Sequence, residues 1–296
     1  MSHLAQFLET DFGDRCRSMI RRLGLRSIAL SLYRTYQSIH GGLRRQFRID
    51  VEGAEVVFVT EDSHSKRFFH HRYRPGQWHE PPVTRQILRH LPGTKTFADV
   101  GAHLGYYGCI AGALDRDRRV FLFEMNHNLV PLIQRNLDAN RLNNAEVVNH
   151  PVSDRRKTVS YDRDSTDAGL SMAEGTATPA TPSHQIETVT LDDFFHERGV
   201  VPDVIKMDVQ GAELEALKGG ERLLRDHHPV LFLEVHPKVI GDFGATVGEI
   251  YDYLTVDLKY KLKRIEEHRR AAAADLLHDI TDAKDLPTTT HMLLCT

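Results

Sequence analysis

Residues 96–107 read TFADVGAHLGYY: an apolar run ends in Asp99, a glycine turn follows, and a helix is expected to begin near Gly105. Gly101 and Gly105 have no Cβ atom, so the backbone of the turn can approach a ligand closely. A helix N-terminus at this point offers free N–H groups to a carboxylate or phosphate of that ligand. The turn is not the dinucleotide-binding pattern G-x-G-x-x-G, because the central glycine is missing.

Outward from this turn, short apolar runs alternate with helical stretches over residues 96–235. The runs include VFLFE, EVVNHPV, VIKMDV and VLFLEV, and amphipathic stretches such as VPLIQRNLDANR and LEALKGGERLLRD separate them. Buried runs that alternate with amphipathic helices are typical of βαβ units. The expected fold class is therefore α/β, with a mostly parallel sheet and helices on both of its faces.

The N-terminal part of the chain follows a different pattern. Residues 1–45 have apolar positions near helical spacing and predict a helical arm. Residues 15–48 contain nine arginines and no acid. They indicate a basic helix that is attracted to anionic lipid or to a phosphorylated partner. The alternative is a helical arm whose arginines are solvated, or which packs on a second subunit. Alternation around Glu52-Gly53 predicts a β-hairpin over residues 47–60, and a helix is expected over residues 82–90.

The expected domain division is an arm and hairpin at residues 1–75 and an α/β domain at residues 76–296. Residues 165–185 are rich in Ser, Thr, Ala, Gly and Pro, which predicts a mobile loop, either a lid or a surface insertion. A long charged helix is expected over residues 249–278. The final apolar run, HMLLCT, is expected to add an edge strand to the sheet.

Composition narrows the classes of protein that fit. The 296 residues are 41% hydrophobic and 27% charged, which suits a globular domain with a core. A net charge of -3 does not indicate a nucleic-acid binder. Three cysteines without C-x-x-C spacing argue against a disulfide framework or a structural zinc site. No apolar run approaches the ~20 residues that span a bilayer, and no signal peptide is recognisable. A cytoplasmic location is expected, with peripheral membrane contact left open.

Carboxylates end two further strands. Glu124 closes VFLFE, near the ~20-residue interval at which an acid meets a ribose hydroxyl in nucleotide-binding folds. Asp208 closes VIKMDV, so it should face the same crevice as Asp99 at the carboxyl ends of the strands. Such acids suit a nucleoside with a cationic end, for example a methyl sulfonium, and repel a pyrophosphate. The alternatives are that Glu124 only caps the next helix and that Glu213 only complements a helix dipole.

The strand VLFLEV is followed by His236. Alternation puts Glu234 and His236 on one face of that strand. A histidine there, with an unperturbed pKa of ~6.5, can take a proton from an acceptor hydroxyl. A structural role is the alternative, because the chain has 18 histidines. Asp208, Glu234 and His236 could also ligate a divalent cation, an interpretation that is not favoured.

Together these residues resemble the FkbM family of S-adenosylmethionine-dependent methyltransferases. The family's turn, D-V-G-A-N-x-G-x-Y, stands here as D-V-G-A-H-L-G-Y-Y from Asp99. Its later segment, K-I-D-V-E-G-A-E, stands here as K-M-D-V-Q-G-A-E from Lys206. The likeness covers about residues 78–240 and departs from the family at His103 and Gln210. Further matches are Glu80, the Asn-Leu-x-x-Asn run at residues 136–140, Ser153 and Leu191-Asp192.

The resemblance implies a Rossmann-like class I methyltransferase fold with a seven-stranded sheet, and S-adenosylmethionine as cofactor. The residues expected to take part in catalysis are Asp208, His236, Lys206 and Glu234. The residues expected to contact the cofactor are Asp99, Gly101, Ala102, His103, Gly105, Tyr107, Glu124, Met125, Asn126, Ser153 and Asp208.

The expected reaction is methyl transfer to an oxygen, hydroxyl or carboxyl, of a carbohydrate or small metabolite. A carbohydrate is the favoured acceptor. The arginine-rich segment leaves a lipid-linked glycan open, and a homodimer is also left open. The alternatives are an RNA methyltransferase, a non-catalytic Rossmann-like binding module and a nicotinamide oxidoreductase. The first lacks a recognisable RNA-binding motif, the second conflicts with the intact carboxylates, and the third lacks the central glycine.

Overall fold

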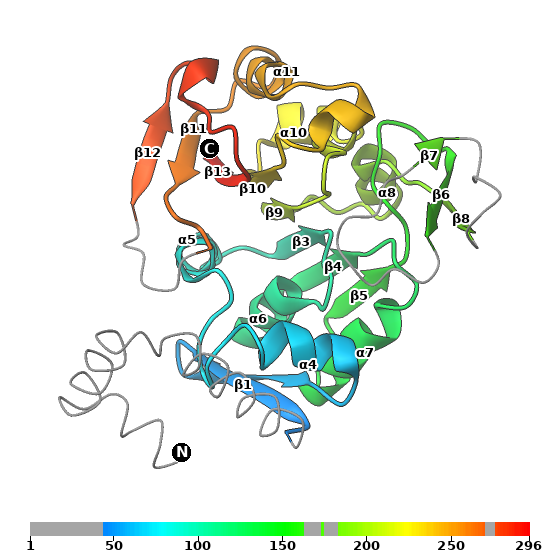
Figure 1. Cartoon of the computed structure of the whole chain (residues 1–296), viewed down its shortest axis with the longest axis vertical. Coiled ribbons are helices and arrows are strands. Elements are labelled where there is room, and N and C mark those ends of the chain that lie inside the picture. Colours follow the sequence, from blue (N-terminus) through cyan, green and yellow to red (C-terminus); the bar gives the residue numbers. More distant parts are fainter. Residues whose placement is uncertain (1–43, 163–172, 175–182, 270–275) are drawn as a thin grey trace, which may run out of the picture. The chain divides into compact units, whose positions relative to one another are not determined.

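The computed structural model describes residues 44–162, 173–174, 183–269 and 276–296 (Figure 1). The predicted N-terminal arm, its arginines before residue 44 and most of the predicted loop lie outside these residues. The chain forms two compact units. The described part of the first is residues 44–47 and 60–75, and the second is Arg48–Val59 with Gly76–Thr296. The hairpin residues 48–59, expected within the N-terminal part, thus belong to the second unit.

The predicted hairpin is confirmed as β1 (Gln46–Val51) and β2 (Ala54–Val59). Its turn residues Glu52 and Gly53 both have positive φ, as the tightest two-residue turns require. In the first unit, α4 (Ser63–Phe69) begins where the Asp62 side chain accepts from the N–H of Ser65 at 2.7 Å. Such a cap supplies a partner for one of the unpaired N–H groups of the first helical turn.

The second unit is built on one eight-stranded sheet, in the order β12-β11-β13-β10-β9-β3-β4-β5. The five strands from β10 to β5 are parallel, and the other three pair antiparallel. The predicted mostly parallel α/β sheet is therefore confirmed. The strands are β3 (Thr96–Val100), β4 (Arg119–Phe123), β5 (Ala145–Val148), β9 (Val204–Met207), β10 (Val230–Val235), β11 (Leu262–Ile265), β12 (Leu277–Ile280) and β13 (His291–Cys295).

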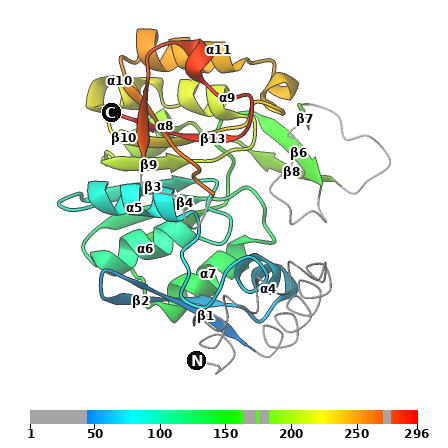
Figure 2. The ribbon, with the colours of Figure 1, turned by 60° about the vertical axis from the view of Figure 1, so that its left-hand side comes forward.

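Helices cover both faces of this sheet, with α8 to α11 on one side and α5 to α7 on the other (Figure 1 and Figure 2). On the first side, Phe121 and Phe123 pack edge-on against Phe194 of α8. On the other side, a Cβ atom at Gly108 would lie 2.4 Å from Leu122 Cδ2, so the glycine lets α6 lie directly on β4. The helices are α5 (Pro81–His90), α6 (Tyr106–Leu114), α7 (Val130–Ala139), α8 (Leu191–Glu197), α9 (Glu213–Lys218), α10 (Glu221–His227) and α11 (Val247–Asp252).

The predicted charged helix over residues 249–278 is wrong. Helix α11 ends at Asp252, and one π-helical turn (Tyr253–Asp257) leads to β11 and β12. Lys259 has φ 63°, which ends helical progression. Tyr260, Leu262 and Ile265 are buried, and β11 gains a ladder with β13. Tertiary pairing thus outweighs the helical propensity of this charged segment.

The strands formed by this segment also explain two smaller differences between the predicted and the observed sheet. The final run does form a strand, β13, but it lies between β10 and β11 and is not an edge. The edge is β12, which adds an eighth strand to the seven expected. No described helix has both the length and the apolar character needed to cross a membrane.

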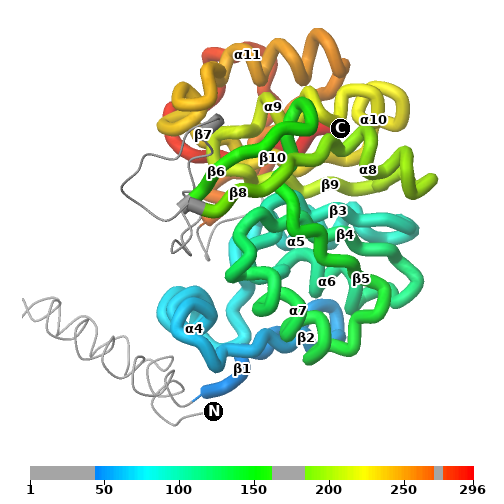
Figure 3. The backbone as a smooth tube through the Cα atoms, turned by 90° about the vertical axis from the view of Figure 1, so that its right-hand side faces the viewer, coloured from blue at the N-terminus to red at the C-terminus, as the bar shows by residue number. Residues whose placement is uncertain are grey.

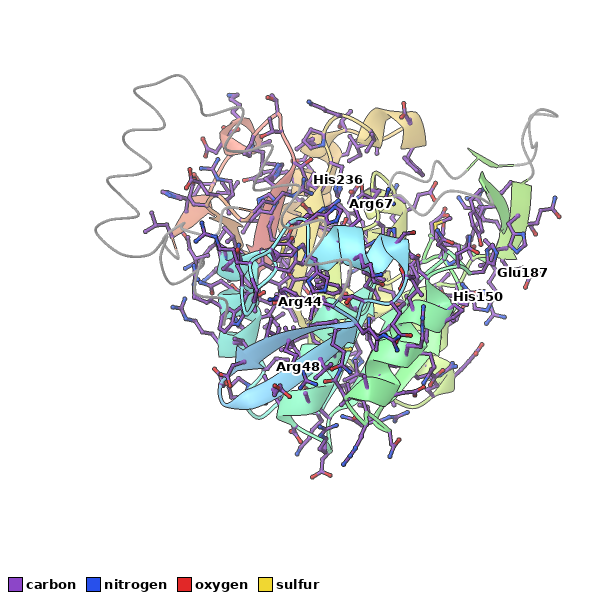
Figure 4. The ribbon with its side chains drawn as sticks, turned by 60° about the horizontal axis from the view of Figure 1, so that its bottom comes forward. Arg44, Arg48, Arg67, His150, Glu187 and His236 are labelled. Carbon is purple, nitrogen blue, oxygen red and sulfur yellow. The ribbon has the colours of Figure 1, made fainter. Side chains whose placement is uncertain are left out.

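A separate three-stranded antiparallel sheet, β7-β6-β8, lies beside the main sheet in Figure 1 and in front of it in the backbone trace of Figure 3. It consists of β6 (Thr158–Asp162), β7 (Ala173–Glu174) and β8 (Ser183–Glu187). The His150 ring, just after β5, donates from Nδ1 to the carbonyl of Glu187 at 2.8 Å, and both residues are labelled in Figure 4. The small sheet is thereby tied to the carboxyl end of β5.

Candidate active site

The turn after β3 is compact because two strand ends nearly touch. Gly101 has φ 79°, and a Cβ atom there would lie 1.9 Å from the carbonyl oxygen of Asp208. No other residue fits this position without moving the strand ends apart. Gly105 (φ 73°) precedes α6, and His103 (φ 54°) also adopts the left-handed region, which Asn and His enter more readily than most residues.

Two asparagines of α7 hold the turn and β2 from behind. Asn136 donates to the carbonyl of Leu104 at 2.8 Å and accepts from the N–H of Val59 at 2.7 Å. Asn140 accepts from the N–H of Val57 at 2.8 Å and donates to its carbonyl at 2.6 Å. Both asparagines are buried. They are the ends of the Asn-Leu-x-x-Asn run, which therefore serves to join β2 and the turn to one helix.

Glu124 joins the end of β4 to the turn. Its carboxylate accepts from the N–H of His103 at 2.7 Å and from the N–H of Asn126 at 2.9 Å. Burial raises its pKa to about 7, although the two N–H groups act in the opposite direction. The Asn149 amide donates to the carbonyls of Glu124 and Met125, which fixes the segment after β4. The structure thus brings His103, Glu124 and Asn126 into one cluster, and Asp99 of β3 lies close enough for its charge to raise the pKa of Glu124.

Lys206 lies between two of the predicted acids. Its Nζ is 3.9 Å from Asp99 Oδ1, 3.6 Å from Asp208 Oδ2 and 3.5 Å from the carbonyl of Gly101, and it faces the Tyr107 ring. Burial lowers the pKa of Lys206, but the charges of Asp208 and Asp99 outweigh this effect. The pKa is therefore raised above its ordinary value, and the ammonium stays charged. Asp99 is fully buried and accepts from the N–H of Gly108. Among the described residues, its Oδ1 has no hydrogen-bond partner.

His236, labelled in Figure 4, contacts acids from two other elements. Its Nδ1 is 2.7 Å from Glu213 Oε1, and its Nε2 is 3.7 Å from Asp208 Oδ1. Burial lowers the pKa of His236, but the bond to Glu213 and the charges of Asp208 and Glu234 raise it above its ordinary value. Glu213 is fully buried and contacts the histidine directly, so its part goes beyond the helix dipole considered from sequence.

Glu234 belongs to a second layer of ionic contacts that the sequence did not indicate. Its Oε1 accepts from Arg269 at 2.6 Å and from His268 at 3.0 Å. Arg269 also lies 3.6 Å from Glu80, whose carboxylate accepts from the Tyr107 hydroxyl at 3.0 Å. Glu80 was known only as a family match, and His268 and Arg269 fell inside the wrongly predicted helix.

Two groups of three ligand atoms lie within 4.8 Å of one another, among the parts of the chain that the structure describes. The first group is Asp208, Glu234 and His236, which the sequence had suggested as ligands of a cation. The second group is Glu80, Glu234 and His268, so Glu234 belongs to both groups. Ser153 is different, because its hydroxyl donates to Glu215 at 2.8 Å and to Asp154 at 3.1 Å. The structure therefore gives Ser153 partners outside the turn that holds Asp99 and Glu124.

The sequence profile of the FkbM methyltransferase domain matches residues 99–262, more than half of the chain. The chain belongs to the FkbM methyltransferase family. The resemblance seen in the sequence is thereby confirmed. The match begins at Asp99 and includes His236, whereas Glu80, His268 and Arg269 lie outside it. The FkbM domain thus provides the turn and the histidine, and flanking parts of the chain provide the partners of Glu234.

A curated relative of this FkbM chain is the hexuronic acid methyltransferase AglP of Haloferax volcanii, 29% identical over 164 residues. The aligned region covers 54% of this chain and 64% of that protein, so the chain spans less than two thirds of this relative's length. Among solved structures, an FkbM methyltransferase of Methylobacillus flagellatus has a TM-score of 0.42 and 17% identity, over 69% of this chain and 44% of that one. A methyltransferase of Agrobacterium tumefaciens has a TM-score of 0.43 and 9% identity, over 86% and 70%.

Proposed function

We propose that this FkbM-family protein transfers the methyl group of S-adenosylmethionine to an oxygen atom of an acceptor. The observation that supports this most directly is the joining of Asp99, the turn and Glu124 into one cluster beside Lys206, Asp208 and His236. Family membership supplies the reaction class. The proposed catalytic part of the chain is residues 76–296 together with the hairpin residues that belong to the same unit.

The cofactor is proposed to lie over the turn. Glu124 would accept hydrogen bonds from the ribose hydroxyls, as an acid at the end of the second strand does in related nucleotide sites. Asp99, whose Oδ1 has no hydrogen-bond partner among the described residues, would offer negative charge to the cationic end of the cofactor. The other contacts are proposed at Gly101, Ala102, His103, Gly105, Tyr107, Met125, Asn126, Ser153 and Asp208.

The reaction is proposed as an in-line displacement at the methyl carbon. Holding the two reactants in line can supply ~7–11 kcal/mol of the barrier. His236 or Asp208 would take the acceptor's proton, an effect of ~10²–10⁴-fold. Lys206 would hold Asp208 through the ionic contact already described, and the charge of Glu234 would help to raise the pKa of His236.

The proposed acceptor is a carbohydrate. The relative from Haloferax volcanii is named for a hexuronic acid, which supports a sugar over RNA. The nine arginines of residues 15–48 support a lipid-linked sugar at an anionic membrane surface. Sedimentation with anionic liposomes at low salt tests the membrane contact, and a protein that stays in the supernatant would remove it from the proposal.

The test of the function is calorimetric titration with S-adenosylmethionine. We expect micromolar binding by the native protein, no binding by Asp99→Ala, and native binding by Asp117→Ala, an exposed aspartate on the far side of α6 from the turn. Thermal unfolding of each variant shows that it is folded. A folded native protein that does not bind S-adenosylmethionine but binds NADH or NADPH would instead support the oxidoreductase alternative.

A further inference from the structure

Glu213 and His236 form a buried pair with one free end. Glu213 Oε1 accepts from the N–H of Gly211 at 2.9 Å and contacts His236 Nδ1 at 2.7 Å. An oxygen that accepts from Gly211 can only accept from the ring as well, so Nδ1 carries a proton, and in the neutral ring the lone pair is on Nε2. Nε2 is buried, and within the described part of the chain it has no hydrogen-bond partner.

The neighbouring acid is less suited to act as a base, because its two oxygens already have partners. Asp208 Oδ1 accepts from the Gln210 amide at 2.9 Å, and Oδ2 lies 3.6 Å from the Lys206 ammonium. Within the described part of the chain, His236 Nε2 has no such partner.

The charges around His236 also bear on the acceptor. The fixed cations of this region are Lys206 and Arg269, as far as the described residues extend. Lys206 lies within 4 Å of both Asp99 and Asp208, and Arg269 within 4 Å of both Glu80 and Glu234. Each cation is thus already opposed by two carboxylates. An acceptor carboxylate brought to His236 would meet uncompensated negative charge, whereas a neutral hydroxyl would not.

We infer that the group methylated is a neutral hydroxyl, and that Glu213 is the positioning residue that holds His236 as the base for it. This rests on the proposed methyl transfer. The acceptor oxygen bonds to the methyl carbon as its proton passes to His236 Nε2. The carbon–sulfur bond breaks, and its electron pair stays on sulfur, which leaves neutral S-adenosylhomocysteine. Glu213 balances the positive charge that the imidazole ring has gained.

The first test measures the tautomer of His236 in the full chain. Long-range ¹H–¹⁵N spectra of histidine-labelled protein, assigned with His236→Gln, should show the proton on Nδ1. Glu213→Leu removes the oxygen that accepts from Nδ1, so the neutral ring should no longer keep its proton on Nδ1, and the form protonated on Nε2 should appear. Glu215→Leu is the matched control, because this residue is on the same helix and contacts Ser153 and Lys157 instead. A native protein with the proton on Nε2 would overturn the inference without any variant.

The second test identifies the bond formed. The protein is incubated with methyl-labelled S-adenosylmethionine and either methyl glucoside or methyl glucuronide, which differ in the carboxylate. We expect an alkali-stable ether, and a ~10²–10⁴-fold lower kcat in Glu213→Gln with unchanged cofactor affinity. Labelled methanol released by mild alkali from the glucuronide would overturn the inference. If neither sugar is methylated, the tautomer of His236 from the first test decides whether the inference holds. If the protein does not bind S-adenosylmethionine, the proposed function fails, whatever the tautomer shows.

Discussion

In the proposed site, the buried side chain of Glu124 would make cofactor binding depend on pH. It has little solvent to stabilise its charge, and only two backbone N–H groups from His103 and Asn126 oppose the rise of its pKa to about 7. The acid is therefore partly protonated near neutral pH in the free protein. Ribose hydroxyls donate best to the ionised form, so binding and deprotonation are linked.

We expect the Kd for S-adenosylmethionine to fall as pH rises from about 6 to 8, by up to about tenfold per pH unit below the pKa of Glu124. The free energy of unfolding of the free protein should fall over the same rise in pH, although cofactor binding becomes tighter. A carboxyl whose pKa is raised on folding favours the folded state at low pH, and this contribution, about 3 kcal/mol, is lost between about pH 4.5 and 7. Calorimetry and urea unfolding across this range measure the two effects. The same pH dependence in Glu124→Gln would assign it to another group, such as His236.

Sequence reasoning at this scale located the side chains whose place in the fold follows from their position along a strand. Asp99, Glu124, Asp208 and His236 were found because each follows a buried run, and parallel strands bring their carboxyl ends together. The roles assigned to them remain proposals. Glu80, His268 and Arg269 could not be ranked in this way, because their importance comes from ionic contacts between distant parts of the chain.

At the level of elements, Asn136 of α7 and Asn140, which caps the end of this helix, connect α7 to β2 and to the glycine turn after β3. The amide group of Asn140 pairs with both backbone groups of Val57, as a neighbouring strand would. Asn136 pairs with Val59 on one side and with Leu104 on the other. The two asparagines are one helical turn apart, yet only Asn136 reaches the turn. Substitutions at the two asparagines can therefore separate an effect on the stability of the fold from an effect on cofactor binding.

We expect Asn140→Ala to lower the free energy of unfolding by about 2–4 kcal/mol, because it leaves the N–H and C=O of Val57 buried and unpaired. Cofactor affinity should stay within about twofold of the native value. Asn136→Ala should be destabilised similarly and should also bind S-adenosylmethionine at least about tenfold more weakly, since Leu104 loses its partner. Urea unfolding and calorimetry measure these quantities. Equal cofactor affinities of the two variants would contradict the assigned link between Asn136 and the turn.

The elements that sequence predicted best were those with strong local patterns. The five buried runs became the parallel strands, and Glu52-Gly53 became the hairpin turn. The segment after Asp252 was mispredicted because its charged residues favour a helix locally, while the sheet offers β11 a partner in β13. That partner lies at the end of the chain, so no local window of sequence contains it.

For the whole molecule, the fold gathers acids from distant positions in the chain around one region of the sheet. Asp208, Glu234 and His236 have the ligand types and spacing of a divalent-cation site. The contacts that Asp208 and Glu234 already make argue against a bound cation. Lys206 is 3.6 Å from Asp208, and Arg269 and His268 both contact Glu234. Lys206 and Arg269 already supply positive charge at the positions where a cation would bind.

We therefore expect methyl transfer to proceed without a divalent cation. After dialysis against EDTA, turnover should stay within about twofold of the untreated protein, and added Mg²⁺ or Mn²⁺ should not raise it, because Lys206 and Arg269 oppose a further positive charge electrostatically. Arg269→Gln supplies the comparison, since it removes one of these cations while keeping a polar side chain. If EDTA abolishes turnover in the native protein and Mn²⁺ restores it, with Mn²⁺ binding lost in His236→Gln, the three residues are metal ligands. In that case His236 Nε2 binds the ion and cannot be the base, so the same experiment also bears on how the acceptor hydroxyl is deprotonated.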